Sequence, residues 1–126
     1  MITGLDHIHI ISSNTEEAVQ YFEKILDGRV ISRIDSRGFP LIRLDVHGVP
    51  VAILGTGPDA GQLIPGKGSK GLDHFGFKVK DLAQTAQELK KKGVKFTVEP
   101  TVTPWGLKMA FIEGPEGIRI ELVERD

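Results

Sequence analysis

The residues of this sequence best suited to chemistry are histidines, carboxylates and arginines that alternate with apolar residues. Because successive side chains of a strand point to opposite faces, such residues would gather on the polar face of a sheet. Two imidazoles and one carboxylate are sufficient to hold a divalent metal ion with positions left open for a substrate. A solvated outer face is the alternative explanation of the same pattern. The polar members of the alternating segments are His7, His9, Arg43, Asp45, His74, Arg119 and Glu121.

The histidines lie in two copies of one motif. Gly4-Leu5-Asp6-His7-Ile8-His9-Ile10 recurs in the second half of the chain as Gly71-Leu72-Asp73-His74-Phe75-Gly76-Phe77. Each copy is followed by a helical pattern and then by three segments that alternate like strands. The repeat therefore predicts two modules with the same order of elements.

Each module has one predicted helix with a capping signal. In the first, Ser13-Asn14-Thr15-Glu16 predicts a capping box in which Ser13 is the N-cap, and Gly28 is the expected stop. In the second, Asp81 and Gln84 take the capping roles and Gly93 ends the helix.

The further strands complete an α+β fold of two βαβββ modules. We expect a single domain over 1–126, with modules 1–54 and 72–126 joined by a glycine-rich linker over 55–71. The strands are expected to form a curled mixed sheet, a cup or half-barrel, with the helices on its outer face. The predicted strands that follow the helices are 28–34, 39–46, 49–54, 94–98, 107–113 and 117–123.

Composition excludes several classes of function. The chain has 126 residues, no cysteine, and 16 basic against 17 acidic side chains. The absence of cysteine excludes disulfides, zinc fingers and thiol nucleophiles, and the balanced charge gives no attraction to nucleic acid or an anionic membrane. The N-terminus lacks the pattern of a signal peptide, and no apolar run approaches the length of a membrane span. We therefore expect a cytoplasmic protein with a small-molecule substrate.

These features together resemble the vicinal oxygen chelate superfamily. The resemblance rests on the paired modules, the Asp6-His7-Ile8 and His74-Phe75 segments, and the closing Gly114-Pro115-Glu116-Gly117-Ile118-Arg119-Ile120-Glu121-Leu122. It covers essentially the whole chain. The superfamily includes glyoxalase I, methylmalonyl-CoA epimerase, extradiol dioxygenases, fosfomycin-resistance enzymes and bleomycin-binding proteins, so its motifs indicate the fold better than the substrate.

The resemblance implies a set of metal ligands. The family's three positions fall on His7, His74 and Glu121, while His9 shares the face of His7 and is an alternative ligand or a supporting residue. Many members have a fourth ligand, glutamate or glutamine, at a position that falls on Ala52. Alanine cannot bind a metal, so the implied site has two histidines and one carboxylate.

Other polar residues are candidates for substrate chemistry. Asp45 is the acid on the polar face of its strand and is our hypothesis for the general base, with a salt bridge to Arg43 as the alternative. Arg43 and Arg119 are candidate binders of a substrate carboxylate or phosphate. For Arg119, pairing with a neighbouring acid is the other explanation.

The resemblance also implies an activity and partners. We expect one divalent ion per site (Zn, Ni, Mn or Fe(II)) and a glyoxalase- or epimerase-like lyase or isomerase that works through a metal-stabilised enolate. The alternatives are an Fe(II) extradiol-type dioxygenase and a ligand-sequestering protein of the drug-resistance kind. Members of the family often form homodimers, with the metal site within one chain or shared between two.

Overall fold

A computed structural model describes residues 5–57, 61, 72 and 74–125 of the chain. The chain divides into two compact units, Met1–Gly61 and Gln62–Asp126, called here the first and the second unit. Within the described residues each unit has one α-helix and one four-stranded sheet in the order βαβββ, so the predicted α+β fold of two βαβββ modules is confirmed. Most of the predicted linker over 55–71 lies outside the described residues.

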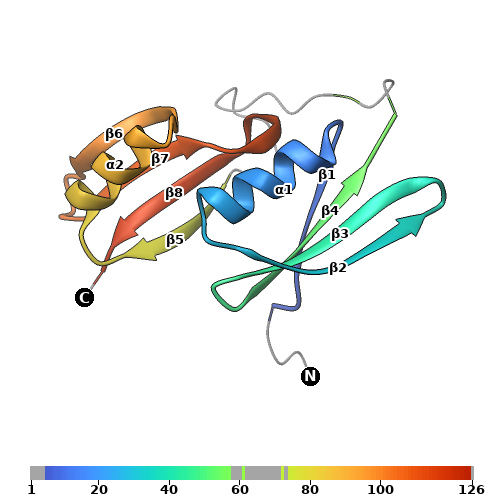
Figure 1. Cartoon of the computed structure of the whole chain (residues 1–126). Coiled ribbons are helices and arrows are strands. Elements are labelled where there is room, and N and C mark those ends of the chain that lie inside the picture. The colour runs from blue at the N-terminus through green and yellow to red at the C-terminus, as the bar shows by residue number, and fades with distance from the viewer. Residues whose placement is uncertain (1–4, 58–60, 62–71, 73, 126) are drawn as a thin grey trace. The chain divides into compact units, whose positions relative to one another are not determined.

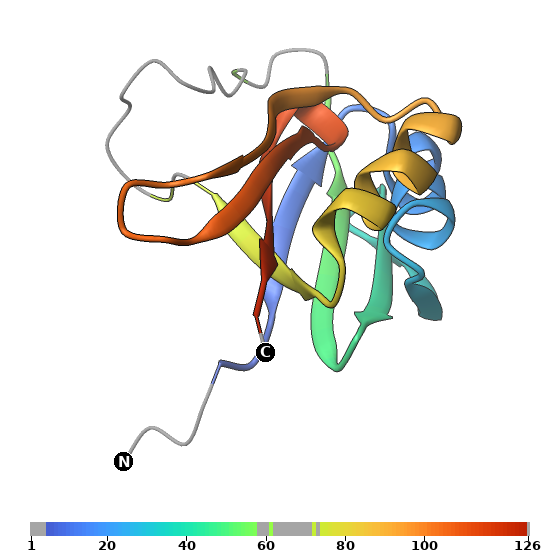
Figure 2. The same cartoon turned by 90° about the vertical axis from the view of Figure 1, so that its left-hand side faces the viewer.

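In the first unit the two outer segments of the sequence become neighbours in the sheet. The strand order is β1-β4-β3-β2, with β1 parallel to β4 and the other pairs antiparallel. Figures 1 and 2 both show β4 (green) beside β1 (blue). The elements are β1 (Ile8–Ser12), α1 (Thr15–Lys24), β2 (Arg29–Ser36), β3 (Phe39–Val46) and β4 (Val49–Gly55).

The second unit repeats this topology. Its sheet has the order β5-β8-β7-β6, again with a parallel first pair and antiparallel others. A short 3₁₀ turn over Pro115–Gly117 joins β7 to β8. Its elements are β5 (Phe75–Val79), α2 (Leu82–Lys91), β6 (Phe96–Val102), β7 (Lys108–Glu113) and β8 (Arg119–Glu124). None of the helices in the described residues is long and apolar enough to cross a membrane.

The helix of the first unit differs from its prediction at both ends. Its N-cap is Asn14 rather than Ser13, because the Asn14 side chain accepts a hydrogen bond from the Glu17 backbone N–H at 3.1 Å. At the other end the left-handed residue is Asp27, with φ of 57°, and not Gly28. A glycine fits at position 28 because the backbone there lies close to the helix: a Cβ on Gly28 would lie 3.0 Å from the carbonyl oxygen of Phe22.

The helix of the second unit follows its prediction at Asp81 and Gly93, but the Gln84 side chain does not take the predicted capping role. The Asp81 side chain accepts from the Gln84 backbone N–H at 3.0 Å, and Gly93 has the left-handed φ of 84° that ends the helix. The Gln84 side chain contacts Glu88 further along the helix. The predicted boundaries of the strands agree to within a few residues, except that β6 continues to Val102.

One face of each sheet is covered by its helix. In the first unit α1 buries Ala18, Val19 and Phe22, and the sheet contributes the buried Ile42, Leu44 and Ile53. Arg33, the cross-strand partner of Ile42, forms an ion pair with Glu16 of α1 at 2.5 Å, which identifies the covered face. Residues one position along each strand therefore point to the opposite face, where the predicted site residues lie.

A carboxylate on the last strand holds the start of α2. Glu124 accepts a hydrogen bond from the Leu82 backbone N–H at 2.9 Å and pairs with Lys108, its cross-strand neighbour, at 3.1 Å. The backbone bond from Leu82 is the main cause that lowers the pKa of Glu124, and Lys108 adds to it. This carboxylate joins the helix to the end of β8 through a backbone N–H of the first helical turn, which has no partner within the helix.

We predict that this contact makes the stability of the second unit depend on pH. Since the pKa of Glu124 is lowered in the folded state, its contribution is present above the unfolded carboxyl pKa of about 4.3 and is lost as pH falls through the folded value. In urea melts from pH 3 to 7, Glu124→Gln should destabilise the protein near neutrality and converge on the wild type in acid. Glu113→Gln, which alters an ion pair with Lys95 in the same unit, is the control. A difference between wild type and Glu124→Gln that stays constant with pH would contradict the assignment.

Candidate metal centre

The registers of the two sheets place the predicted site residues at equivalent positions. In the first unit Ala52 lies between His9 on β1 and Arg43 on β3. In the second unit Glu121 lies between Gly76 on β5 and Phe111 on β7. Ala52 and Glu121 therefore occupy the same place in the two sheets, as the sequence alignment of the repeats predicts. The first unit has no carboxylate where the second unit has one.

In the second unit two of the predicted ligands lie side by side. His74 immediately precedes β5, Glu121 is on β8, and both are partly buried. His74 Nε2 and Glu121 Oε1 are 3.5 Å apart. Two ligands that each lie about 2.0–2.2 Å from one zinc ion are separated by a similar distance, roughly 3–3.5 Å. This imidazole–carboxylate pair is chemically and geometrically suited to supply two ligands of a divalent ion.

A glycine makes room for the carboxylate. Gly76 is the neighbour of Glu121 on the parallel strand, and a Cβ at Gly76 would lie 3.3 Å from the Glu121 Cβ and 3.4 Å from its Oε1. A larger residue at this position would displace the Glu121 side chain. The glycine that interrupts the second motif, where the first has His9, therefore has a local structural reason.

Phe111 is a part of this site that the sequence analysis missed. The ring of His74 meets the buried Phe111 ring edge-on, with the centroids 4.9 Å apart. The guanidinium of Arg119 lies 4.2 Å from the centroid of the same ring. Phe111 therefore contacts one predicted ligand and one predicted substrate-binding residue. Its role follows from the β7–β8 register, which pairs it with Glu121 and which no local sequence signal reveals.

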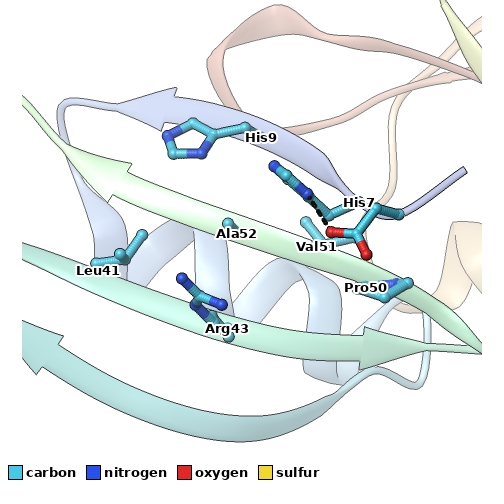
Figure 3. Close-up of a pocket in the computed structure, with 8 residues that line it drawn as sticks. His7, His9, Leu41, Arg43, Pro50, Val51 and Ala52 are labelled. Carbon is cyan, nitrogen blue, oxygen red and sulfur yellow. Dashed lines mark hydrogen bonds and ion pairs between the residues drawn. The ribbon is translucent and has the colours of Figure 1, made fainter.

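In the first unit three predicted residues line one cavity. Its volume is about 340 Å³, and Figure 3 shows His9 and Arg43 on the strands to either side of Ala52. The rings of His7 and His9 lie 6.4 Å apart. The full lining is Asp6, His7, His9, Leu41, Arg43, Pro50, Val51 and Ala52.

Asp6 is a second residue that the sequence analysis missed. Its Oδ2 lies 2.8 Å from His7 Nδ1 (Figure 3). A carboxylate on one ring nitrogen fixes the orientation of an imidazole and leaves the other nitrogen for a metal ion. The signal was present in the sequence, because Asp6 directly precedes His7 in the repeated motif.

Asp45 is not among the residues that line this cavity, although its cross-strand partner Pro50 is. Its carboxylate accepts a long hydrogen bond, 3.4 Å, from the Gly48 backbone N–H in the turn between β3 and β4. Its cross-strand partners are Arg29 and Pro50. Asp45 does share the polar face of β3 with Arg43, two residues away, so its proposed role as general base rests on that placement.

Within the described part of the chain, no group of three or more histidine, aspartate or glutamate side chains is close enough to hold one metal ion. His74 and Glu121 are the predicted ligands whose side chains meet. The pair fits a divalent ion as part of a ligand set but does not form a complete set by itself.

Comparison with known proteins identifies the family. The Glyoxalase/Bleomycin resistance protein/Dioxygenase superfamily matches residues 4–122 of the chain. This match spans both βαβββ units and the predicted ligand positions. The chain belongs to this superfamily.

Individual relatives are distant or match only in part. A "Probable lactoylglutathione lyase, chloroplastic" of Arabidopsis thaliana is 45% identical over 56 residues, which are 44% of this chain but only 16% of that protein. The structure of a glyoxalase family protein from Enterococcus faecalis has a TM-score of 0.85 at 21% identity, covering 96% of this chain and 97% of that one.

A further solved structure contains a metal ion. A variant of the fosfomycin resistance protein FosX from Listeria monocytogenes, in complex with Mn(II) and 1S,2S-dihydroxypropylphosphonic acid, has a TM-score of 0.73 at 16% identity. The comparison covers 98% of this chain and 90% of that one. At these identities the two structures establish the shared fold.

We predict that Phe111 and His74 are energetically coupled. Edge-to-face aromatic pairs contribute about 0.5–1.5 kcal/mol beyond the area that they bury. A double-mutant cycle with Phe111→Leu and His74→Ala, measured by urea unfolding, should give a coupling free energy in this range. The control combines Phe111→Leu with Lys90→Ala, whose ammonium lies over the Phe96 ring, and should be additive. Additivity in both cycles would mean that Phe111 does not hold the His74 ring.

Proposed function

We propose that this protein is a divalent-metal-dependent enzyme of the glyoxalase or epimerase type, a lyase or isomerase, that acts on a small substrate with two neighbouring oxygens. The observation that carries the proposal is the pairing of His74 with Glu121 over Gly76. A structural role alone does not require an imidazole and a carboxylate at the centre of this sheet face. Membership of the superfamily and the likeness to a structure that contains Mn(II) support the proposal.

In this proposal the ligands are His7, His74 and Glu121. Asp6 orients His7 in the first unit, and Phe111 orients His74 in the second. His7 belongs either to the same chain or to a second copy in a homodimer, which is the assembly that we propose for this cytoplasmic protein. Ala52 offers no fourth ligand, so two histidines and one carboxylate leave coordination positions open to substrate.

When bound, the divalent ion, for which Zn, Ni, Mn and Fe(II) are candidates, would polarise the neighbouring oxygens of the substrate. Asp45 would take the proton from the substrate carbon and return it. Arg43 would bind an anionic group of the substrate from the wall of the first-unit cavity. Arg119, held over the Phe111 ring, would do the same in the second unit.

We predict that the purified protein binds about one divalent ion per chain. His74→Ala and Glu121→Ala should each weaken the binding of Zn or Mn by at least about 100-fold, because a lost ligand costs more than a lost supporting residue. Calorimetric titration of metal into the apo protein measures the effect, and thermal melts show whether each variant is folded.

The matched control is His47→Ala. His47 lies in the β3–β4 turn, and its Nε2 is 2.7 Å from the carbonyl oxygen of Leu26. This substitution removes an imidazole of the same unit as His7 but should leave metal affinity unchanged. Equal affinity in wild type and His74→Ala would show that the proposed ligands are wrong.

We also predict that turnover needs neither oxygen nor a redox-active metal. The protein loaded with Zn or Ni should isomerise an α-keto hemithioacetal or an acyl thioester under anaerobic conditions. Asp45→Asn should lower kcat by about 10²- to 10⁴-fold, as expected for the loss of a general base. Turnover of catechols that is confined to Fe(II) and consumes oxygen would establish a dioxygenase instead. Tight ligand binding without turnover would establish a sequestering protein.

A further inference from the structure

The polar face of the first unit is divided into cross-strand rows of different chemistry. The register places His9, Ala52 and Arg43 in one row across β1, β4 and β3. Two residues along each strand, the next row on the same face contains only aliphatic side chains. Its members are Ile11, Leu54, Leu41 and Ile34, from β1, β4, β3 and β2.

This aliphatic row is partly uncovered. Ile11 is 56% exposed and Ile34 is 53% exposed, although both lie in regular strands with aliphatic partners on the neighbouring strand. Leu54 is half-buried and Leu41 is buried. Since the covered face of the sheet already has α1, these four side chains are not needed against the helix. Leaving aliphatic surface exposed forgoes about 25 cal/mol for each Å².

The row is continuous with the candidate site. Leu41 lines the same cavity as His7, His9 and Arg43, and Figure 3 shows Leu41 on β3 beside Arg43. The two rows are separated by about 6.6 Å, the rise of two strand residues. A ligand with its polar end in the cavity therefore meets the aliphatic row directly.

We propose that the substrate has an unbranched apolar substituent, which lies along Ile11, Leu54 and Leu41 while its oxygens lie in the cavity beside His9 and Arg43. This inference rests on the proposed function and specifies its substrate class. The three strands span about 10 Å, roughly the length of a six- to eight-carbon chain. The row with His9 and Arg43 and the aliphatic row together select an anionic or oxygen-rich head with an alkyl tail.

The test is the binding of unbranched 2-oxo acids from pyruvate to 2-oxooctanoate, measured calorimetrically with the full chain. Affinity should rise about threefold for each added methylene, with an increasingly negative heat-capacity change. Ile11→Ser and Leu54→Asn should flatten this dependence on chain length and leave the affinity for pyruvate within about twofold of wild type.

The matched control is Ile31→Ser. Ile31 is 55% exposed, almost the same as Ile11, but it is the extra residue where the β2–β3 register shifts and so lies outside the row. Its variant should keep the full dependence on chain length. The same dependence in Ile11→Ser and in wild type would overturn the proposal, as would failure of every 2-oxo acid to bind.

Two further readouts separate the alternatives. If Ile11→Ser converts a dimer to a monomer without changing the dependence on chain length, the row is an interface between copies and the proposal is wrong. Metal affinity, measured on the same variants, tests the proposed function independently. If the protein binds no divalent metal but its affinity for 2-oxo acids still rises with chain length, the metal-dependent function is refuted and the apolar subsite is supported.

Discussion

The candidate site depends on one constraint, the close approach of neighbouring strands in a parallel pair. Glu121 can extend over the sheet because its neighbour on β5 is Gly76, where a Cβ would lie 3.3 Å from the Glu121 Cβ. In the first unit the sizes are reversed, with His9 on β1 beside the small Ala52 on β4. Each sheet therefore has one large polar side chain at this point and one small neighbour that makes room for it.

The two faces of each sheet differ in composition: the face under the helix is apolar, and the opposite face carries the candidate site residues. Fully buried aliphatic residues form an apolar layer in each unit, for example Ile53 in the first and Ile112 in the second. The opposite face carries the imidazoles, the carboxylate and the arginines. Since loss of a buried aliphatic side chain costs about 2–5 kcal/mol, the apolar layers tolerate little change. The exposed polar side chains of the opposite faces can vary with less effect on folding, which is consistent with the diverse activities named in the description of the superfamily.

The order of elements and the two faces of each strand were predictable, because both follow from periodicity and from the internal repeat. The third strand, Phe39–Val46, agrees with its prediction at both ends. The N-cap of the first helix was misassigned by one residue, because Ser13 and Asn14 are both good caps and only the backbone geometry selects Asn14. The contacts of His74 with Glu121 and Phe111 depend on strand register, and a single sequence does not determine the register. The ring contact of Phe111 and the place of Leu41 in the cavity lining were therefore not predictable from their own positions.

The divergence of the repeats gives the two units different side chains at equivalent positions. At the position where the second unit has Glu121, the first has Ala52, so its face retains Arg43 and His9 without a carboxylate between them. An acid there would pair with Arg43 and neutralise its charge. In the second unit the equivalent of Arg43 is Phe111, which packs on His74 and does not compete for the carboxylate. A glutamate in place of Ala52 would lie beside Arg43 in the first unit. An arginine in place of Phe111 would lie beside Glu121 in the second. The two differences therefore keep the arginine of the first unit and the carboxylate of the second each without an oppositely charged cross-strand neighbour.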